Sequence, residues 1–412
     1  MKNLKNSIHS DFQSIDFDKW KEGAKRTLKN IDLDVLLTKN ITKRISIKSI
    51  YNKSQVERYF DLEFQKLDTT TKNEINLSQL TDLPCESDLE AAWLIHQIDK
   101  TQSNEISISV IIDKNFFLSI AKFRAIRYLL SQRPGIKFTI TAVSSDYNKS
   151  TIDIENNIIR LTTEAMSAII GGADKINLET YNSLIQNDDF GRRITDNILV
   201  LLENESYLKH VEDPLAGSYL VENMTNQFIV SVESYIANLK DCKDSTERNS
   251  FMIWNCTLYK EEIIAQLDSQ KKKLVGVNIY QSKKVNIENI KIDENRFASP
   301  FEKMKIKVDK INPKVYIANF EEINALQPSV TMSLNTFNIP FQVSGIFELV
   351  EDAFNTIKLY DPDIVVVNGN DNIYRILNNM LSEYKLISID EFSDNSILKN
   401  LDIVVSKMTM GV

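Results

Sequence analysis

The sequence predicts an α/β protein with two parallel-sheet domains joined by a linker. Apolar strand-like runs alternate with helical periodicity over residues 106–208, and the same alternation restarts after Pro313. Between these regions, residues 268–310 are rich in Lys, Asn and Asp and contain Pro300, which is typical of a linker. Alternating strands and helices build a mainly parallel sheet or a barrel. The 412 residues are enough for two or three domains, at roughly 150 residues each.

The elements of the first half follow from apolar spacing. An amphipathic helix is expected at 16–29 and a short strand at 45–51. Ser87, with Glu90 three residues later, forms a capping-box pattern that opens a helix extending to Ile98. Further strands are expected at 106–112, 136–143 and 175–178, with helices at 115–130, 154–170 and 190–208. The strand–helix–strand order of 106–143 predicts a right-handed βαβ unit.

The second half predicts a helix, the linker and a small doubly wound domain. The helix is expected at 228–239. After the linker, strands are expected at 315–318, 364–367, 386–389 and 403–405, with helices at 331–336, 348–359 and 371–381. Residues 314–412 carry 13 acidic and 6 basic side chains, a net charge of −7, so nearly all of the chain's excess charge of −8 lies there.

Composition excludes several classes of protein. A chain with 49 basic and 57 acidic residues and no long basic stripe is a poor nucleic-acid binder. No apolar run reaches the roughly 18 residues of a membrane span, and residues 1–13 lack the apolar stretch of a secretory signal. Cys85, Cys242 and Cys256 are widely spaced, as in reduced cytosolic proteins. We therefore expect a cytoplasmic protein.

The scarcity of glycine and histidine excludes several common catalytic motifs. With ten glycines, the chain has no dinucleotide-binding or P-loop motif, and it has no GxSxG elbow. His9, His96 and His210 are far apart, so no metal site is expected. His96 and His210 are predicted to be structural. The Lys271–Lys273 run is predicted to be a solvated helix end, with contact to a CoA phosphate as the alternative.

Several segments together carry a family resemblance, and the most specific reads Asp-Pro-Leu-Ala-Gly-Ser-Tyr-Leu-Val-Glu. It contains a signature of five residues: Asp213, Pro214, Gly217, Ser218 and Tyr219. The other segments are Asn115–Arg127, Asn156–Asp174, Gly276–Asn278 and Pro313–Asn319. The chain thereby resembles the methylmalonyl-CoA mutase family, specifically its small, non-catalytic subunit. On residue types alone, the signature is a turn and helix cap, with Asp213 accepting backbone N–H groups.

The resemblance implies an acyl-CoA-holding (β/α)₈ barrel, a wrapping linker and a flavodoxin-like cobalamin domain. About five strands can be placed before residue 180, so a shortened TIM-barrel-like domain is expected. The expected parts are an N-terminal helical extension (1–44), the shortened barrel (45–225), a helical linker region (226–312) and a degenerate flavodoxin-like cobalamin-binding-type domain (313–412).

The resemblance also points to lost cofactor ligands. The family holds cobalamin through an Asp-x-His-x-x-Gly loop, and here Ile323, Ala325 and Pro328 stand at the Asp, His and Gly positions. Alanine offers no nitrogen to cobalt. The strand that matches the family's catalytic histidine reads Lys-Phe-Thr-Ile at 137–140, and no histidine occurs between 97 and 209. No catalytic, cofactor-binding or metal residues are therefore expected in this chain.

These observations predict the non-catalytic small subunit of a heterodimeric adenosylcobalamin-dependent methylmalonyl-CoA mutase. The large catalytic partner would hold the cofactor and the acyl-CoA, and would cover strand edges exposed near Ile106–Ile112 by the missing barrel units. One alternative is a stand-alone acyl-CoA isomerase. Another is a small-molecule-binding α/β module using the C-terminal crevice, where Asn319 and Asn368–Asn370 follow strands.

Overall fold

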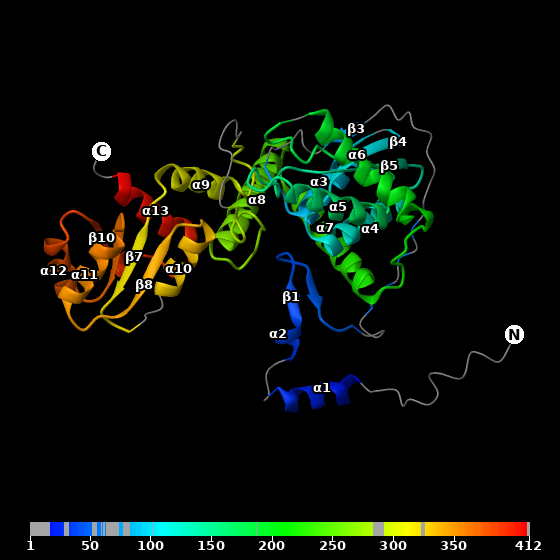
Figure 1. Cartoon of the computed structure of the whole chain (residues 1–412). Coiled ribbons are helices and arrows are strands. Elements are labelled where there is room, and N and C mark those ends of the chain that lie inside the picture. The colour runs from blue at the N-terminus through cyan, green and yellow to red at the C-terminus, as the bar shows by residue number, and fades with distance from the viewer. Residues whose placement is uncertain are drawn as a thin grey trace.

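Two α/β lobes make up the body of the chain. The computed structural model describes residues 17–28, 33–51, 56–58, 60, 62, 74–76, 83–101, 103–186, 188–282, 292–322 and 326–409. Figure 1 shows an N-terminal and a C-terminal lobe linked by helices α8 (Ser245–Asp268) and α9 (Ser299–Ile311). The predicted N-terminal helix is α1 (Phe17–Thr27), and it lies apart from both lobes.

The N-terminal lobe is built on an open parallel sheet. Its described strands run in the order β3 (Glu74–Asn76), β4 (Glu105–Ile111), β5 (Lys137–Val143) and β6 (Lys175–Asn177). The helices of this lobe are α3 (Ser87–Ile98), α4 (Phe116–Ser131), α5 (Asn156–Ile170), α6 (Asp189–Asn204) and α7 (Tyr219–Asp241). The predicted alternation is confirmed, and the arrangement is that of a partial barrel.

Strand β4 lies at the centre of this sheet, between β3 and β5. Ile106, Ile108 and Val110 are buried on it, so the expectation of an exposed strand edge near Ile106–Ile112 was wrong. Helix α7 packs across α3 and α4, and Phe228 and Val232 on α7 belong to the same core. The described edges of the sheet are β3 and β6.

The start of α3 differs from the predicted capping box. Ser87 lies inside the helix, and its Oγ donates to Asp113 Oδ2 at 2.6 Å. Glu90 accepts from Lys122 Nζ at 2.5 Å and from the Ile111 N–H at 2.9 Å. Ser87 therefore contacts the loop between β4 and α4, and Glu90 contacts both of these elements. Local spacing does not reveal this tertiary arrangement.

The C-terminal lobe has the flavodoxin-like strand order. Four parallel strands run β10 (Lys385–Ser388), β9 (Ile364–Asn368), β7 (Val315–Asn319) and β8 (Phe341–Ile346). Helices α10 (Leu326–Thr336) and α13 (Ile397–Thr409) contribute to one hydrophobic core, and α11 (Val350–Tyr360) and α12 (Asp371–Met380) to a second. The second strand pairs with the first, as in doubly wound flavodoxin-like sheets.

Several elements of the chain differ from the sequence prediction. The strand expected at 403–405 is part of α13, because Ile397, Leu401 and Val404 share one buried helical face. Strand β8 is mostly exposed, and it was not predicted. Helices α8 and α9 were not predicted individually, although both lie in the region expected to be a helical linker (226–312).

Residues 33–48 form a small structure of their own. Helix α2 (Leu33–Leu37) leads directly into the antiparallel pair β1 (Thr38–Asn40) and β2 (Ser46–Lys48). Gln227 on α7 accepts from the Ser46 N–H at 2.9 Å and donates to its carbonyl at 3.0 Å. The hairpin is thereby attached to the N-terminal lobe, and β2 is the strand predicted at 45–51.

Candidate functional site

A cavity lies where the N-terminal lobe meets the linker, at the carboxyl ends of β4 and β5. It encloses about 680 Å³. The Asp113–Asn115 segment after β4 and Asn148 after β5 form one side, and Tyr259 on α8 and Phe297 form another. In parallel α/β folds this edge of the sheet is where ligands bind.

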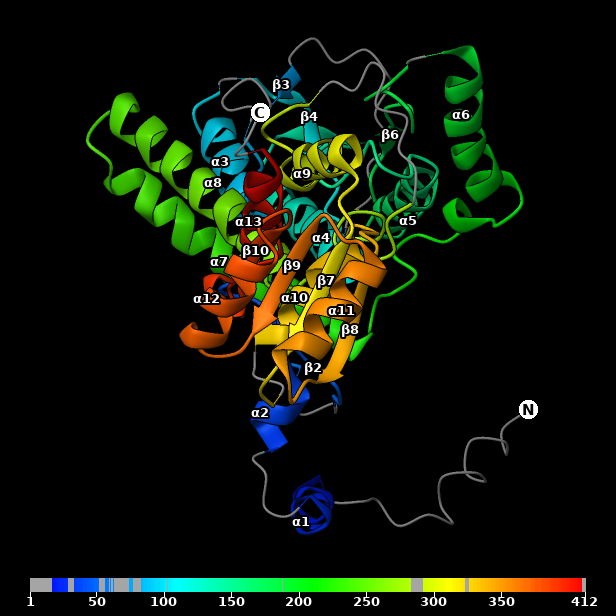
Figure 2. The ribbon, with the colours of Figure 1, turned by 60° about the vertical axis from the view of Figure 1, so that its left-hand side comes forward.

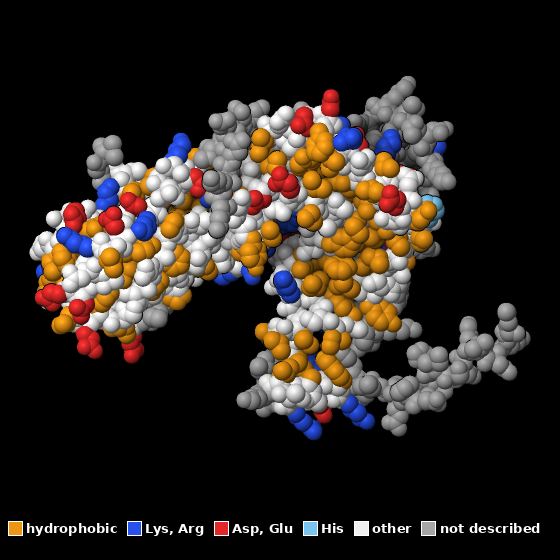
Figure 3. Space-filling model, viewed as in Figure 1, with side chains coloured by type: hydrophobic (Ala, Val, Ile, Leu, Met, Phe, Trp, Pro, Cys, Tyr) orange, Lys and Arg blue, Asp and Glu red, His pale blue; other side chains and the backbone are white. Residues whose placement is uncertain are grey.

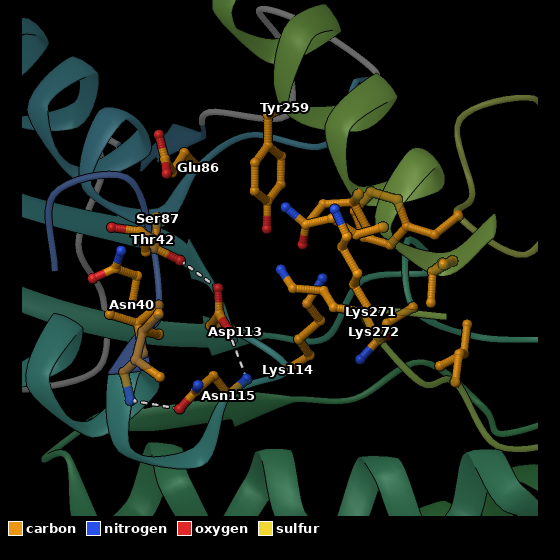
Figure 4. A pocket seen from close by; sticks show the side chains of 18 of the residues that line it. Asn40, Thr42, Glu86, Ser87, Asp113, Lys114, Asn115, Tyr259, Lys271 and Lys272 are labelled. Atoms are coloured by element: carbon orange, nitrogen blue, oxygen red, sulfur yellow. Dashed lines mark hydrogen bonds between the residues drawn. The ribbon is translucent and has the colours of Figure 1, made fainter. Parts of the chain in front are cut away.

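Two carboxylates, Glu86 and Asp113, line the cavity (Figure 4), and both accept hydrogen bonds from the protein. Asp113 accepts from the Ser87 hydroxyl at 2.6 Å and from the Asn115 N–H at 2.7 Å. Glu86 accepts from the Tyr235 hydroxyl at 3.3 Å, and burial raises the pKa of Glu86. Hydrogen bonds therefore fix the acidic side of the cavity before any ligand enters.

Lysines line the cavity from three segments of the chain: Lys39, Lys114, Lys271, Lys272 and Lys273. Figure 4 shows Lys114, Lys271 and Lys272 on the side away from Glu86. Asn278 shapes the segment after α8, because its Nδ2 donates at 2.8 Å to the carbonyls of Leu267 and Lys272. The Lys271–Lys273 run thus follows a helix end, as predicted, but it lines a cavity instead of being simply solvated.

Lys114 has the most perturbed environment of these lysines. Its side chain opens onto the cavity, and the ammonium nitrogen lies 4.5 Å from the centre of the Phe297 ring. Desolvation lowers the pKa of Lys114 to about 8. The negative charge of Asp113 opposes this shift, and the positive charge of Lys272 adds to it. Burial also raises the pKa of Tyr259. Sequence spacing gave no signal for this lysine, because its surroundings come from α8 and the linker.

The Asp213–Tyr219 signature forms an ion-paired turn. The Asp213 carboxylate accepts from the Arg124 guanidinium, which also donates to Glu222 at 2.9 Å. Gly217, with φ +80°, donates its N–H to Glu222 at 2.8 Å. Asp213 was expected to accept backbone N–H groups with its side chain. Instead its backbone carbonyl accepts from Ala216 at 3.0 Å, and its carboxylate binds Arg124.

The remaining signature residues lead into α7. Pro214 lies in the turn, Ser218 is the N-cap residue of α7 without a side-chain capping bond, and Tyr219 is the first helical residue. None of the five signature residues lines the cavity. Their contacts are those of a folded turn.

Only part of the loop that corresponds to the family's cobalamin ligands lies within the described residues. Ile323 and Ala325 lie outside the described residues, and Pro328 lies in the first turn of α10, where proline is tolerated. Nearby, Asn368 Nδ2 donates to Asn319 Oδ1 at 3.1 Å, and the Asn370 side chain caps α12. The asparagines proposed for a C-terminal crevice therefore hold strand and helix ends together.

Other singled-out residues have structural surroundings. Glu164 pairs with Lys149 at 2.6 Å, whereas the neighbouring Arg160 donates to Asn157 and to the Val275 carbonyl. His96 is buried on α3, and desolvation lowers its pKa. Within the described ranges, no three His, Cys, Asp or Glu side chains group as metal ligands would, and no helix has the length and apolarity to cross a membrane.

The fold defines a class of protein in which a partial TIM-like barrel is joined through helices to a flavodoxin-like lobe. The family model described as methylmalonyl-CoA mutase matches residues 97–354, which is more than half of the chain. The chain belongs to the methylmalonyl-CoA mutase family, as the sequence resemblance predicted.

Curated relatives support this assignment. The methylmalonyl-CoA mutase small subunit of Porphyromonas gingivalis is 38% identical over 135 residues, covering 30% of this chain and 22% of the relative. Methylmalonyl-CoA mutase of Escherichia coli is 26% identical over 209 residues (46% and 29%). A probable mitochondrial methylmalonyl-CoA mutase of Caenorhabditis elegans is 28% identical over 236 residues (52% and 31%). The chain spans less than a third of the length of these relatives.

Proposed function

We propose that this chain is the non-catalytic small subunit of a heterodimeric, adenosylcobalamin-dependent methylmalonyl-CoA mutase. The partner subunit would carry out the interconversion of methylmalonyl-CoA and succinyl-CoA, and this chain would stabilise or assemble it in the cytoplasm. The relative from Porphyromonas gingivalis, which is named a small subunit, supports the same role.

One observation carries the proposal: the histidines that the chemistry needs are absent from the sequence. No histidine occurs between 97 and 209 or after His210, and Ala325 stands at the cobalt-ligand position. A methyl side chain cannot coordinate cobalt, and Ile323 cannot orient an imidazole. The residues present do not fit cobalamin, so the cofactor is assigned to the partner.

The surface of the N-terminal lobe supports a protein partner. Phe190 and Leu201 on α6 and Tyr207 and Val211 after it are exposed apolar side chains. Figure 2 shows α6 at the margin of the lobe, near the edge strand β6, and Figure 3 shows apolar side chains gathered over this lobe. We name the surface formed by Phe190, Leu201, Tyr207 and Val211 the α6 face. A catalytic mutase chain would cover the α6 face, and obligate interfaces bury on the order of 2,000–5,000 Å².

The test uses the full chain, alone and with the catalytic mutase chain of the same organism. Alone, the chain is expected to self-associate and to leave the visible spectrum of adenosylcobalamin unchanged. Co-expression is expected to give a 1:1 complex by light scattering, with mutase activity that requires the catalytic chain. A base-off cobalamin spectrum with the isolated chain, or methylmalonyl-CoA turnover by it, would overturn the proposal.

A further inference from the structure

We propose that the cavity between the N-terminal lobe and the linker binds a small phosphate ester of nucleotide size, through the lysines that line it. None of Lys39, Lys114, Lys271, Lys272 and Lys273 forms an ion pair with a described residue. Like charges converging on one cavity repel each other, and a bound anion removes that repulsion. Lysine is a common phosphate ligand.

The two acidic residues of the cavity offset only part of the charge of these lysines. Asp113 attracts Lys114 and Lys272 and opposes the lowering of their pKa values. It also accepts hydrogen bonds from Ser87 and from the Asn115 N–H. Glu86 is buried, and burial raises its pKa. With five lysines against two carboxylates, the lining has an excess of positive charge.

The N-terminus of α4 adds to this field. Asn115 caps the helix by accepting from the Leu118 N–H at 3.2 Å, and it also lines the cavity. The helix is 16 residues long, so its N-terminal dipole contributes partial positive charge on the same side as Lys114. The lysines and the helix N-terminus therefore both favour a negatively charged ligand.

The size and the aromatic walls indicate the rest of the ligand. About 680 Å³ is within the range of small-molecule sites, roughly 300–1,000 Å³, and exceeds what a lone phosphate needs. Tyr259 and Phe297 lie against the cavity at 6.1 Å between ring centres, and their apolar surfaces suit a planar base. A nucleoside diphosphate has both an anionic group for the lysines and a planar base for the aromatic rings.

Binding would connect segments that are distant in sequence. Lys39 comes from the β1–β2 hairpin, Lys114 from the segment after β4, and Lys271–Lys273 from the segment after α8. An anion shared among them would fix the hairpin and the linker against the N-terminal lobe. The site needs neither cobalamin nor a partner chain, so it stands apart from the small-subunit role.

The experiment is isothermal titration of the full chain with ADP and with inorganic pyrophosphate. Both are expected to bind and to raise the melting temperature, with ADP tighter if the aromatic walls hold the base. The triple variant Lys271→Gln, Lys272→Gln, Lys273→Gln is expected to weaken binding about tenfold or more, since charged hydrogen bonds are lost. The matched control, Lys137→Gln, Lys175→Gln, Lys240→Gln, removes the same charge outside the cavity and is expected to bind normally.

A second measurement needs no variant. Acetylation of the unmodified chain by a dilute active ester, read by mass spectrometry, is expected to show ADP protecting Lys114 and Lys271–Lys273 but not Lys137. Absence of binding by both compounds at millimolar concentration would overturn the proposal. Equal loss in the control triple variant, or protection of lysines without regard to position, would do so as well.

Discussion

Arg124 connects the family-like turn to the helices beneath it. Its side chain is fully buried and donates to Asp213 and to Glu222. Burial raises the pKa of Asp213, while Arg124 opposes that shift. Two carboxylates in one buried site repel each other unless a cation lies between them, so the turn depends on this guanidinium.

Replacing this arginine is expected to destabilise the chain strongly. Arg124→Ala leaves Asp213 and Glu222 uncompensated, which costs about 3–5 kcal/mol of unfolding free energy. Arg133→Ala is the control, because Arg133 pairs with Asp99 in a partly exposed position, and such pairs contribute about 1 kcal/mol or less. Urea denaturation of both variants measures the difference. Equal losses would contradict the structural role of the turn.

Lys114 makes stability depend on pH in a defined window. Its pKa is about 8 in the folded chain and about 10.4 in an unfolded one. Between these values the unfolded state binds more protons, so the free energy of unfolding rises with pH across the window. Lys114→Met removes this titration. The stability of the wild type relative to the variant is expected to increase from pH 8 to pH 10, and a difference that stays constant would refute the lowered pKa.

At the residue scale, the sequence identified the signature turn but not the cavity. Asp213 and Gly217 were found because their residue types and order match the family. The cavity beside Lys114 exists only where α8 and the linker meet the segment after β4, and these segments lie far apart in the chain. The Gly276–Asn278 segment carries part of the family resemblance, but its sequence does not reveal that Asn278 donates to the Lys272 carbonyl.

At the element scale, α9 attaches the linker to the N-terminal lobe. Glu302 on α9 binds Arg296 through two hydrogen bonds, at 2.8 and 2.6 Å, and accepts from the Thr151 N–H at 2.8 Å. Glu302 and Arg296 are both buried. A charged pair in the interior is costly to break on one side only.

Removing this carboxylate is expected to loosen the attachment. In Glu302→Ala, residues 149–152 and 296–311 should exchange amide hydrogens faster, because a buried guanidinium and a backbone N–H lose their acceptor. The free energy of unfolding should fall by about 3–5 kcal/mol. Glu294→Ala removes an exposed partner of Lys303 and should leave exchange unchanged at 149–152. Hydrogen exchange by mass spectrometry distinguishes these outcomes, and equal exchange in both variants would contradict the anchoring role.

Strongly periodic elements were predictable from the sequence, and context-dependent ones were not. Helices α4 and α5 and strands β4, β5 and β9 match their predicted ranges closely, because apolar spacing marks them. Strand β8 is mostly exposed and contains Ser344 and Gly345, so its apolar signal is weak. Helix α13 carries the β-branched pair Val404–Val405 on a helical face, and there tertiary packing decided the conformation against local propensity.

At the scale of the whole molecule, charge and apolar surface are unevenly distributed. The C-terminal lobe holds nearly all of the net negative charge, whereas the lysine-lined cavity lies against the N-terminal lobe. The exposed apolar residues of the α6 face lie on the N-terminal lobe as well. A partner that covers the α6 face would leave the acidic lobe in water, where its charge favours solubility.

The last prediction tests the α6 face as the contact with the catalytic chain. Leu201→Asp places a charge on an apolar surface, and if the partner covers it the Kd of the complex should rise about fivefold or more. Leu359→Asp is the control, because Leu359 is 88% exposed on α11 of the C-terminal lobe. Biolayer interferometry with the catalytic chain measures both, and circular dichroism checks the folds. Unchanged binding by Leu201→Asp, or equal weakening by Leu359→Asp, would place the interface elsewhere, since a charge buried in a contact must cost affinity.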